Sequence, residues 1–161
     1  MTGTRQRFPR AASWFASHRW GMWLSKTVYT PLDKLMYRLT RGRRGLSPPK
    51  TVLLLTTTGR KSGLPRRVPV LYLKDGGIVW VMASNFGQPR HPAWSANLLA
   101  NPEATIRTGR VERRVTARLA SDDEKKTLWP RLVELYPAWE AYKGWADRDF
   151  RLFCLEPAGD A

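Results

Sequence analysis

The segment from Thr56 to Pro69, TTTGRKSGLPRRVP, gathers three threonines, a serine, two glycines and four cationic side chains. Apolar runs rich in valine and leucine flank it at Val52–Leu55 and Val68–Leu73, and both are short enough to be buried strands. Its glycines would let backbone N–H groups turn inward, while its arginines and lysine supply charge and forked donors for a phosphate or a carboxylate. The composition predicts either an anion-binding loop or an ordinary solvated basic loop, and the segment alone does not separate the two.

Several other chemistries are excluded by spacing or by residue counts. A nucleotide triphosphate loop needs glycine directly before the Lys-Ser pair and again five residues earlier, where this chain has Arg60 and Leu55. The sequence has no dinucleotide-binding glycine fingerprint, and no nucleophile-elbow motif supports a Ser-His-Asp triad. The chain's histidines and cysteines are His18, His91 and Cys154, too few for a His/Cys zinc site, so we expect no bound metal.

Length and charge predict one domain with a basic N-terminal arm. The chain has 161 residues and a formal net charge of +15, and it is long enough to bury a sizeable core. Residues 1–50 contain 11 of the 28 Lys and Arg but only one of the 13 acids, so they read as an arm and linker, and residues 51–161 as the domain. A single cysteine excludes an intramolecular disulfide and fits a cytoplasmic setting. We find neither a signal peptide nor a run of about 20 apolar residues that could span a bilayer.

Beyond residue 50 the pattern predicts mostly antiparallel strands interrupted by helices. Hairpin turns are expected at Lys74–Gly77 and at Thr108-Gly109, and a closing strand follows from Phe150. Three helices are expected. The first lies within His91–Pro102, and the third covers Tyr136–Trp145. The second begins at the capping box of Ser121–Glu124 and runs toward Leu135, with a kink at Pro130. Five or six such strands indicate an α+β fold, with a barrel as the favoured arrangement.

The N-terminal arm contains an amphipathic segment after a less regular one. Ala11–Thr30 reads as a helix whose tryptophans are spread around it. Thr30 and Pro31 suit the start of a second helix, in which Leu32, Leu35, Met36 and Leu39 form an apolar stripe opposite Lys34, Arg38 and Arg41. This stripe predicts either a helix lying on a membrane surface or one packed against the barrel.

Three segments in close succession carry a family resemblance: LLTTTGRKSGLPRRVPVLYL, VMASNFGQPRHPAWSANLLANP and LYPAWEAYKGWADR. Together they resemble the deazaflavin-dependent nitroreductase family, actinobacterial split β-barrel proteins that use coenzyme F420. The resemblance extends from about Thr51 to Pro157. It implies a split β-barrel with an N-terminal helical arm, acting as an oxidoreductase that transfers a hydride from reduced F420 to a quinone, a nitroaromatic compound or an activated enone. The basic arm favours a quinone, since a surface helix would bring the enzyme to a lipid-dissolved substrate.

The resemblance also assigns roles to individual residues. The long anionic cofactor would be bound by fifteen positions: Thr58, Gly59, Arg60, Lys61, Ser62, Gly63, Arg66, Pro69, Met82, Ala83, Ser84, Asn85, Ala93, Trp94 and Asn97. Tyr136, Trp139 and Tyr142 would line the acceptor side, and Tyr142, Tyr136, Ser84 or water would deliver a proton. Taken without the motif order, Trp94 and Trp139 read as core aromatics. Phe86 stands where relatives often have a small residue, and Trp139 where they can have tyrosine.

Two other classes of protein share some of these features. An oxidoreductase barrel that binds flavin mononucleotide would have the same fold but take a shorter anion. A nucleic-acid-binding module would use the positive charge and the aromatic residues, but the charge is concentrated in the arm while the aromatics occur in both halves of the chain. We therefore expect a small-molecule acceptor and no specific nucleic acid, with a peripheral membrane contact through the arm as the further expectation. The sequence does not indicate an oligomeric state.

Overall fold

The computed structural model describes residues 14, 17–18, 27–28, 30–39 and 51–159. The helix predicted over Ala11–Thr30 lies largely outside these residues, and so does the linker at 41–50. Within the arm, the described element is the helix α3 (Thr30–Leu39). It begins at the threonine–proline pair that suits the start of a helix.

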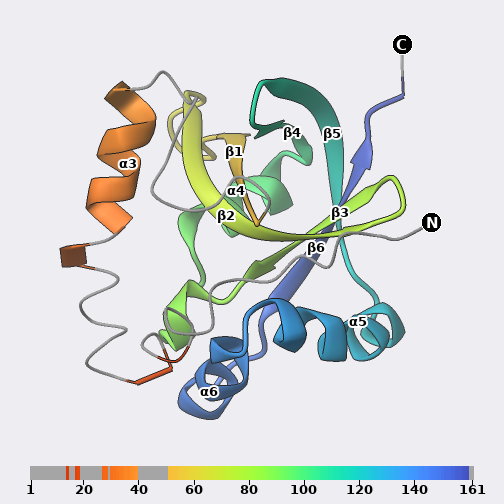
Figure 1. Ribbon diagram of the computed structural model, residues 1–161. Helices are drawn as coiled ribbons and strands as arrows, with labels where there is room; N and C mark the ends of the chain where they lie inside the picture. The colour runs from red at the N-terminus through yellow and green to blue at the C-terminus, as the bar shows by residue number, and fades with distance from the viewer. Residues whose placement is uncertain (1–13, 15–16, 19–26, 29, 40–50, 160–161) are drawn as a thin grey trace.

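Six antiparallel strands close into a barrel (Figure 1). The strands are β1 (Val52–Thr58), β2 (Pro65–Asp75), β3 (Ile78–Ala83), β4 (Glu103–Thr108), β5 (Val111–Leu119) and β6 (Arg151–Pro157). Around the barrel the order is β1-β2-β3-β6-β5-β4, and β4 pairs back onto β1. The last strand thus lies between β3 and β5. The predicted α+β barrel is confirmed.

Two glycine turns fix the hairpins at the predicted places. Asp75 pairs with Ile78 and Thr108 with Val111, so each hairpin has a two-residue loop. The first residue of each loop, Gly76 and Gly109, has φ of +59° and +60°. Glycine adopts this left-handed conformation without steric cost, which is why these sequences turn where they do.

The barrel interior is filled by alternate side chains of the strands. Leu53 and Leu55 of β1 and Phe153 of β6 belong to this cluster, and the helix α4 (Ala93–Ala100) adds Trp94 and Leu98 to it. A side chain in a strand points to the face opposite its neighbours, so a two-residue period along β1 leaves every second residue inside. The interior cluster therefore holds α4 directly against the barrel.

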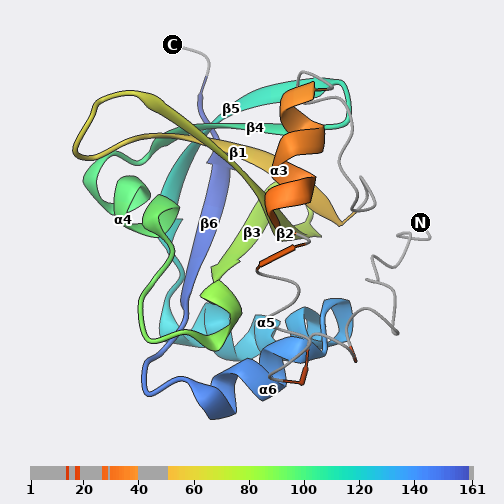
Figure 2. The ribbon, with the colours of Figure 1, turned by 90° about the vertical axis from the view of Figure 1, so that its left-hand side faces the viewer.

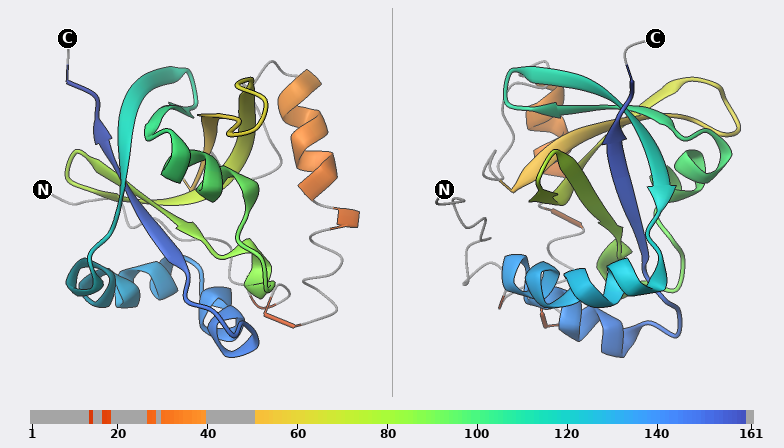
Figure 3. Two further views of the ribbon diagram at one scale, coloured as in Figure 1. Left: turned by 180° about the vertical axis from the view of Figure 1, so that it is seen from behind. Right: turned by 90° about the vertical axis from the view of Figure 1, so that its right-hand side faces the viewer.

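A second core lies on the outer face of the sheet, beneath α5 (Asp122–Leu135) and α6 (Ala138–Trp145). Trp80 of β3 and Cys154 of β6 are register partners, and they pack with Leu132 of α5 and Tyr142 of α6. Figures 2 and 3 show both helices side by side across one end of the barrel. α5 runs through Pro130 to its end at Leu135. This second core is what places α6 next to the end of β3.

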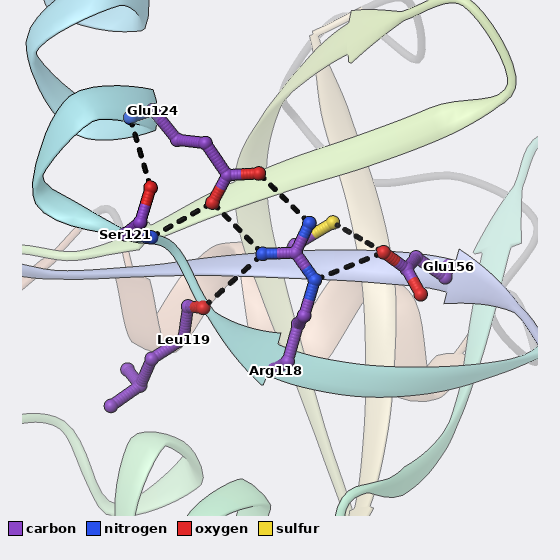
Figure 4. Close-up of polar contacts among 6 residues, drawn as sticks. Arg118, Leu119, Ser121, Glu124 and Glu156 are labelled. Carbon is purple, nitrogen blue, oxygen red and sulfur yellow. Dashed lines mark hydrogen bonds and ion pairs between the residues drawn. The ribbon is translucent and has the colours of Figure 1, made fainter.

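An arginine network fastens the start of α5 to the barrel (Figure 4). The Arg118 guanidinium of β5 donates to both carboxylate oxygens of Glu124 at 2.9 and 2.8 Å, and to Glu156 of β6 at 3.0 Å. Glu124 also completes the predicted capping box, since its Oε2 accepts from the Ser121 N–H at 2.8 Å while its own N–H donates to the Ser121 hydroxyl at 3.2 Å. These donors, Arg118 foremost, lower the pKa of Glu124 from its ordinary 4.5 to about 2.

α3 stands beside β2 with much of its apolar stripe uncovered (Figures 1 and 2). Leu32, Leu35 and Leu39 are 47%, 48% and 70% exposed, whereas Met36 is partly buried. Among the described residues, no helix combines the length and the apolarity needed to cross a bilayer. The stripe is therefore available for contact with something other than the described part of the chain.

The Glu124 network predicts how stability depends on pH. Because the folded state depresses the pKa of this carboxyl, its ionised form adds stability that is present above pH 4.5 and is lost as pH falls toward 2. We expect Glu124→Gln to lower the free energy of unfolding at pH 7 and to lose less stability between pH 4.5 and 2 than the wild type. Denaturant unfolding at a series of pH values measures both. Glu112→Gln, which removes an exposed carboxylate paired with Arg107, is the matched control. Equal pH dependence of the Glu124→Gln variant and the wild type would contradict the assignment.

Candidate active site

The loop between β1 and β2 is folded on itself by its own backbone. The Gly59 N–H donates to the Leu64 carbonyl at 2.8 Å, and the Gly63 N–H to the Gly59 carbonyl at 2.7 Å. A Cβ on Gly59 would lie 2.6 Å from the Ser62 hydroxyl and 3.1 Å from the Leu64 carbonyl, and Gly63 has φ of +66°. Both glycines are thus needed for the turn. Both glycine N–H groups bond within the loop, so the exposed cationic side chains are the candidate anion donors.

The side chains of Arg60, Lys61 and Arg66 are exposed at this loop. Arg66 Nη2 donates to the Ser62 hydroxyl at 3.3 Å, which directs the guanidinium along the loop. Within the described part of the chain, none of the three forms an ion pair. Their charge is therefore not neutralised by a neighbouring described carboxylate, and this donor set suits phosphate and carboxylate groups, as an F420-type anion requires.

Asn97 joins the loop to the barrel and to α4. Its Nδ2 donates to the Thr57 hydroxyl at 3.0 Å, and its Oδ1 accepts from the Arg60 N–H at 3.1 Å. Asn97 and Thr57 are both buried, so the bonds satisfy groups that water does not reach. Asn97 therefore anchors the loop itself.

The segment after β3 makes an unusual turn before α4. It runs from Ser84 to His91 and includes the short 3-10 helix η2 (Asn85–Gly87). Asn85 and Phe86 have φ of 48° and 56°, two consecutive non-glycine residues in the left-handed region. At Gly87 (φ +69°) a Cβ would lie 3.0 Å from the Tyr142 carbonyl oxygen, so the turn packs directly on α6. Strained backbone of this kind is concentrated at functional sites.

The three aromatic residues expected on the acceptor side lie together, and all are buried. The Tyr136 and Tyr142 hydroxyls are 3.0 Å apart, and Trp139 Nε1 donates to the Ser84 hydroxyl at 3.2 Å. Tyr142 is 1% exposed, and burial followed by the neighbouring Tyr136 raises its pKa far above 10. Phe86 packs edge-on against Tyr142 with the ring centroids 6.2 Å apart. This cluster is closed to solvent in the structure.

The remaining predicted cofactor residues surround these two features. Thr58 ends β1, Pro69 pairs with Leu54 on the barrel wall, and Ala93 is exposed at the start of α4. Met82 belongs to the outer core and Ala83 to the interior cluster. Trp94 is buried in the barrel interior, where its ring lies 5.7 Å from that of Phe153. Figure 2 shows α4 between the β1–β2 loop and the turn after β3, so the helix connects the two parts of the site.

Arg148 and His91 are contacts of this site that sequence reasoning missed. Arg148 donates to the carbonyls of Ser84 and Gln88, both at 2.8 Å, and lies 3.0 Å from His91 Nδ1. Burial, then Arg148 and Arg151, lower the pKa of His91 below 6.5, so the ring is neutral at pH 7 and Nδ1 accepts from the guanidinium. Both residues occur inside the motif segments, but no spacing rule marks either of them.

Comparison with known proteins identifies the class to which this barrel and site belong. Residues 32–157 match the model of the F420H(2)-dependent quinone reductase family. A Mycobacterium tuberculosis protein whose name includes the words F420H(2)-dependent quinone reductase is 39% identical over 113 residues, which cover 70% of this chain and 95% of that protein. The chain belongs to this family, whose members use reduced F420.

Solved structures agree with the fold. The structure of an F420-H2 dependent reductase, FDR-A, superimposes with a TM-score of 0.61 at 36% identity, covering 66% of this chain and 94% of that one. The Vibrio cholerae heme storage protein HutZ has a TM-score of 0.52 at 16% identity, covering 80% of this chain and 92% of that one, and shows the split barrel alone. The expectation of a split β-barrel in a deazaflavin-using family is confirmed.

The Asn97 bridge yields a test that needs no ligand. Asn97→Ala leaves the buried Thr57 hydroxyl and the Arg60 N–H without these partners, which costs about 1–3 kcal/mol for an unsatisfied buried group. We expect a loss of that size in the free energy of unfolding, together with faster amide exchange at Arg60. Asn101→Ala, which removes a bond to the Glu103 N–H just beyond the C-terminal end of α4, is the control. An Arg60 amide that exchanges at the wild-type rate in the Asn97→Ala variant would refute the anchoring role.

Proposed function

We propose that this protein transfers a hydride from reduced F420 to a quinone. The observation that carries the proposal is the β1–β2 loop, which Asn97 anchors through the Arg60 N–H and which presents three exposed cations without a described acidic partner. A deazaflavin supplies two-electron hydride chemistry when bound, and its phosphate and glutamate tail match the charge of this loop. The family relationship supports the same cofactor and acceptor class.

The chain's own residues would hold the two ends of the cofactor. Arg60, Lys61 and Arg66 would bind the anionic tail, with Ser62 directing Arg66. The Ser84–Asn85 edge at the end of β3 would meet the ring. Other residues would shape the two sides of the site: on the loop side Thr58, Gly59, Gly63 and Pro69, and on the barrel side Met82, Ala83, Ala93 and Trp94. Trp139 already donates to the Ser84 hydroxyl, which leaves the Ser84 O–H free to donate toward a bound molecule.

The acceptor would lie on the side of Tyr136, Trp139 and Tyr142. Because these side chains are buried, an acceptor reaches them only when a group that covers them moves, and we propose Phe86, which packs edge-on against Tyr142, as that group. The raised pKa of Tyr142 keeps its hydroxyl protonated, so it can donate a hydrogen bond but is a weak acid. This argues against Tyr142 as the proton source, so Ser84, Tyr136 and water remain as the candidates.

Arg66 and Arg67 provide a matched pair of variants for the cofactor proposal. They are neighbours on β2, so their side chains point to opposite faces of the sheet. Arg66 lies on the same face as its register partner Thr57, and Arg67 lies on the same face as Thr56. Loss of a charged hydrogen bond costs about 1.5–3 kcal/mol, so Arg66→Ala and Lys61→Ala should raise the Kd for F420 by roughly tenfold to a hundredfold. Fluorescence titration with F420 measures the change. We expect Arg67→Ala to bind F420 as tightly as the wild type does. An equal loss of affinity in Arg66→Ala and Arg67→Ala would instead indicate non-specific charge attraction.

We further propose that the arm rests on a membrane surface and brings the site to a lipid-dissolved quinone. The exposed stripe of Leu32, Leu35 and Leu39, together with the basic excess of residues 1–50, supports a helix at an anionic lipid interface. The competing arrangement, packing onto the barrel, would cover these leucines.

Substitution of the stripe tests the membrane proposal without disturbing the barrel. Each partly inserted leucine contributes on the order of 1 kcal/mol, so Leu35→Asp with Leu39→Asp should lower binding to anionic vesicles by about tenfold or more. Co-sedimentation at low salt measures the binding. Val111→Asp, an equally exposed apolar position on β5, should have little effect. Wild-type protein that does not sediment with anionic vesicles would disprove the anchor.

A further inference from the structure

We propose that Arg148 is a positioning residue whose guanidinium holds the turn from Ser84 to His91 in the conformation that the cofactor ring requires. The proposal rests on the proposed function, because the Ser84–Asn85 edge is the part of the site assigned to the deazaflavin. It adds a residue from the α6–β6 connection to a site otherwise built from the loop, β3 and α4.

A single side chain spans the whole turn. Arg148 donates through Nη2 to the Ser84 carbonyl at 2.8 Å and through Nε to the Gln88 carbonyl at 2.8 Å. Nη1 donates to His91 Nδ1 at 3.0 Å, and longer contacts reach the Arg90 carbonyl at 3.3 Å and the Ala83 carbonyl at 3.4 Å. The guanidinium also lies over the Phe150 ring, 5.1 Å from its centroid. Both ends of the turn are thus tied to one rigid plane.

The turn needs such an external restraint. Asn85 and Phe86 are held in the left-handed region, which non-glycine residues adopt at a cost, and η2 has only three residues. Its internal bonds are few: the Gly87 N–H donates to the Ser84 carbonyl at 3.1 Å and the Gln88 N–H to the Asn85 carbonyl at 3.1 Å. The Asn85 side chain adds a bond to the Arg90 carbonyl at 2.7 Å. Packing of Phe86 and Gly87 on Tyr142 restrains the middle of the turn, whereas Arg148 joins its two ends.

Arg148 and Trp139 restrain the same serine from two sides. Arg148 binds the Ser84 carbonyl, while Trp139 donates to the Ser84 hydroxyl. The pair therefore fixes both the backbone and the side chain at the edge proposed to meet the cofactor ring. Loss of Arg148 would free the backbone while leaving the indole bond in place.

The contacts require arginine specifically. All of the acceptors are neutral, five carbonyls and an imidazole nitrogen, and they are spread over six residues, the neighbouring Asp149 included. A planar guanidinium presents five N–H donors in a fixed fork, whereas a lysine ammonium presents three donors at one point. Arg148→Lys would therefore keep the charge but could reach only part of the turn. The role consequently depends on the shape of the donor group, which separates it from a simple need for positive charge.

The test compares Arg148→Met and Arg148→Lys with Arg118→Met. Arg118 is a matched control, because it is also a multidentate arginine that joins distant segments, but it binds Glu124 and Glu156 at the start of α5. Two readouts are taken at a temperature well below each variant's Tm. The first is hydrogen–deuterium exchange of residues 84–91 in ligand-free protein, and the second is the Kd for F420 by fluorescence titration.

We expect Arg148→Met to speed amide exchange within residues 84–91 by tenfold or more and to raise the Kd for F420 by about tenfold, which corresponds to about 1.4 kcal/mol. Arg148→Lys should show a smaller change in both. Arg118→Met should lose stability while exchange in this segment and the Kd stay within twofold of the wild type.

Each other outcome would overturn a particular part of the proposal. Unchanged exchange in Arg148→Met would show that the turn does not depend on the guanidinium. Faster exchange with an unchanged Kd would show that the turn is held but that the cofactor does not need it. A wild-type protein that fails to bind F420 would overturn the proposed function and the cofactor role of Arg148 together, while the exchange data would still decide whether Arg148 holds the turn.

Discussion

Closure of the sheet is the constraint on which the rest of this structure depends. β4 pairs back onto β1 and β6 fills the place between β3 and β5, so every strand has two neighbours. A closed barrel fixes the position and direction of each strand end, because strand tilt and register are linked. The two connections that form the site leave from such fixed ends: the loop from β1 and the turn from β3.

Two polar side chains, the buried Asn97 and the partly buried Arg148, then convert this frame into a site. Asn97 ties the cationic loop to α4, and Arg148 ties the turn after β3 to the connection before β6. In both cases backbone groups of an irregular segment are satisfied by a side chain from another element, which is how loops can be rigid without forming regular structure. The cations themselves stay exposed and need only be presented by the loop.

The fold followed from local signals in the sequence. Paired glycine turns, the Ser121–Glu124 capping box and alternating apolar strands each report on a few neighbouring residues, and all three are present as predicted. The cationic loop was also visible, because charge and glycine are properties of composition. The roles of Asn97, His91 and Arg148 were not visible in this way, since the partners that define these roles lie 37 to 65 residues away. No periodicity encodes such a distance, and the left-handed φ of Phe86 likewise contradicts the preference of its residue type.

The position of β6 in the barrel has a consequence for the order in which this chain can fold. β1 to β5 pair in two groups, β1-β2-β3 and β1-β4-β5, which leaves β3 and β5 as open edges until the last strand arrives. Each edge presents unpaired N–H and C=O groups, the feature through which partly folded sheets associate. A nascent chain ending before residue 151 therefore carries two unpaired edges at once. Their protection during synthesis depends on the sixth strand, which pairs with residues 34 to 76 positions earlier in the sequence and is made only after α5 and α6.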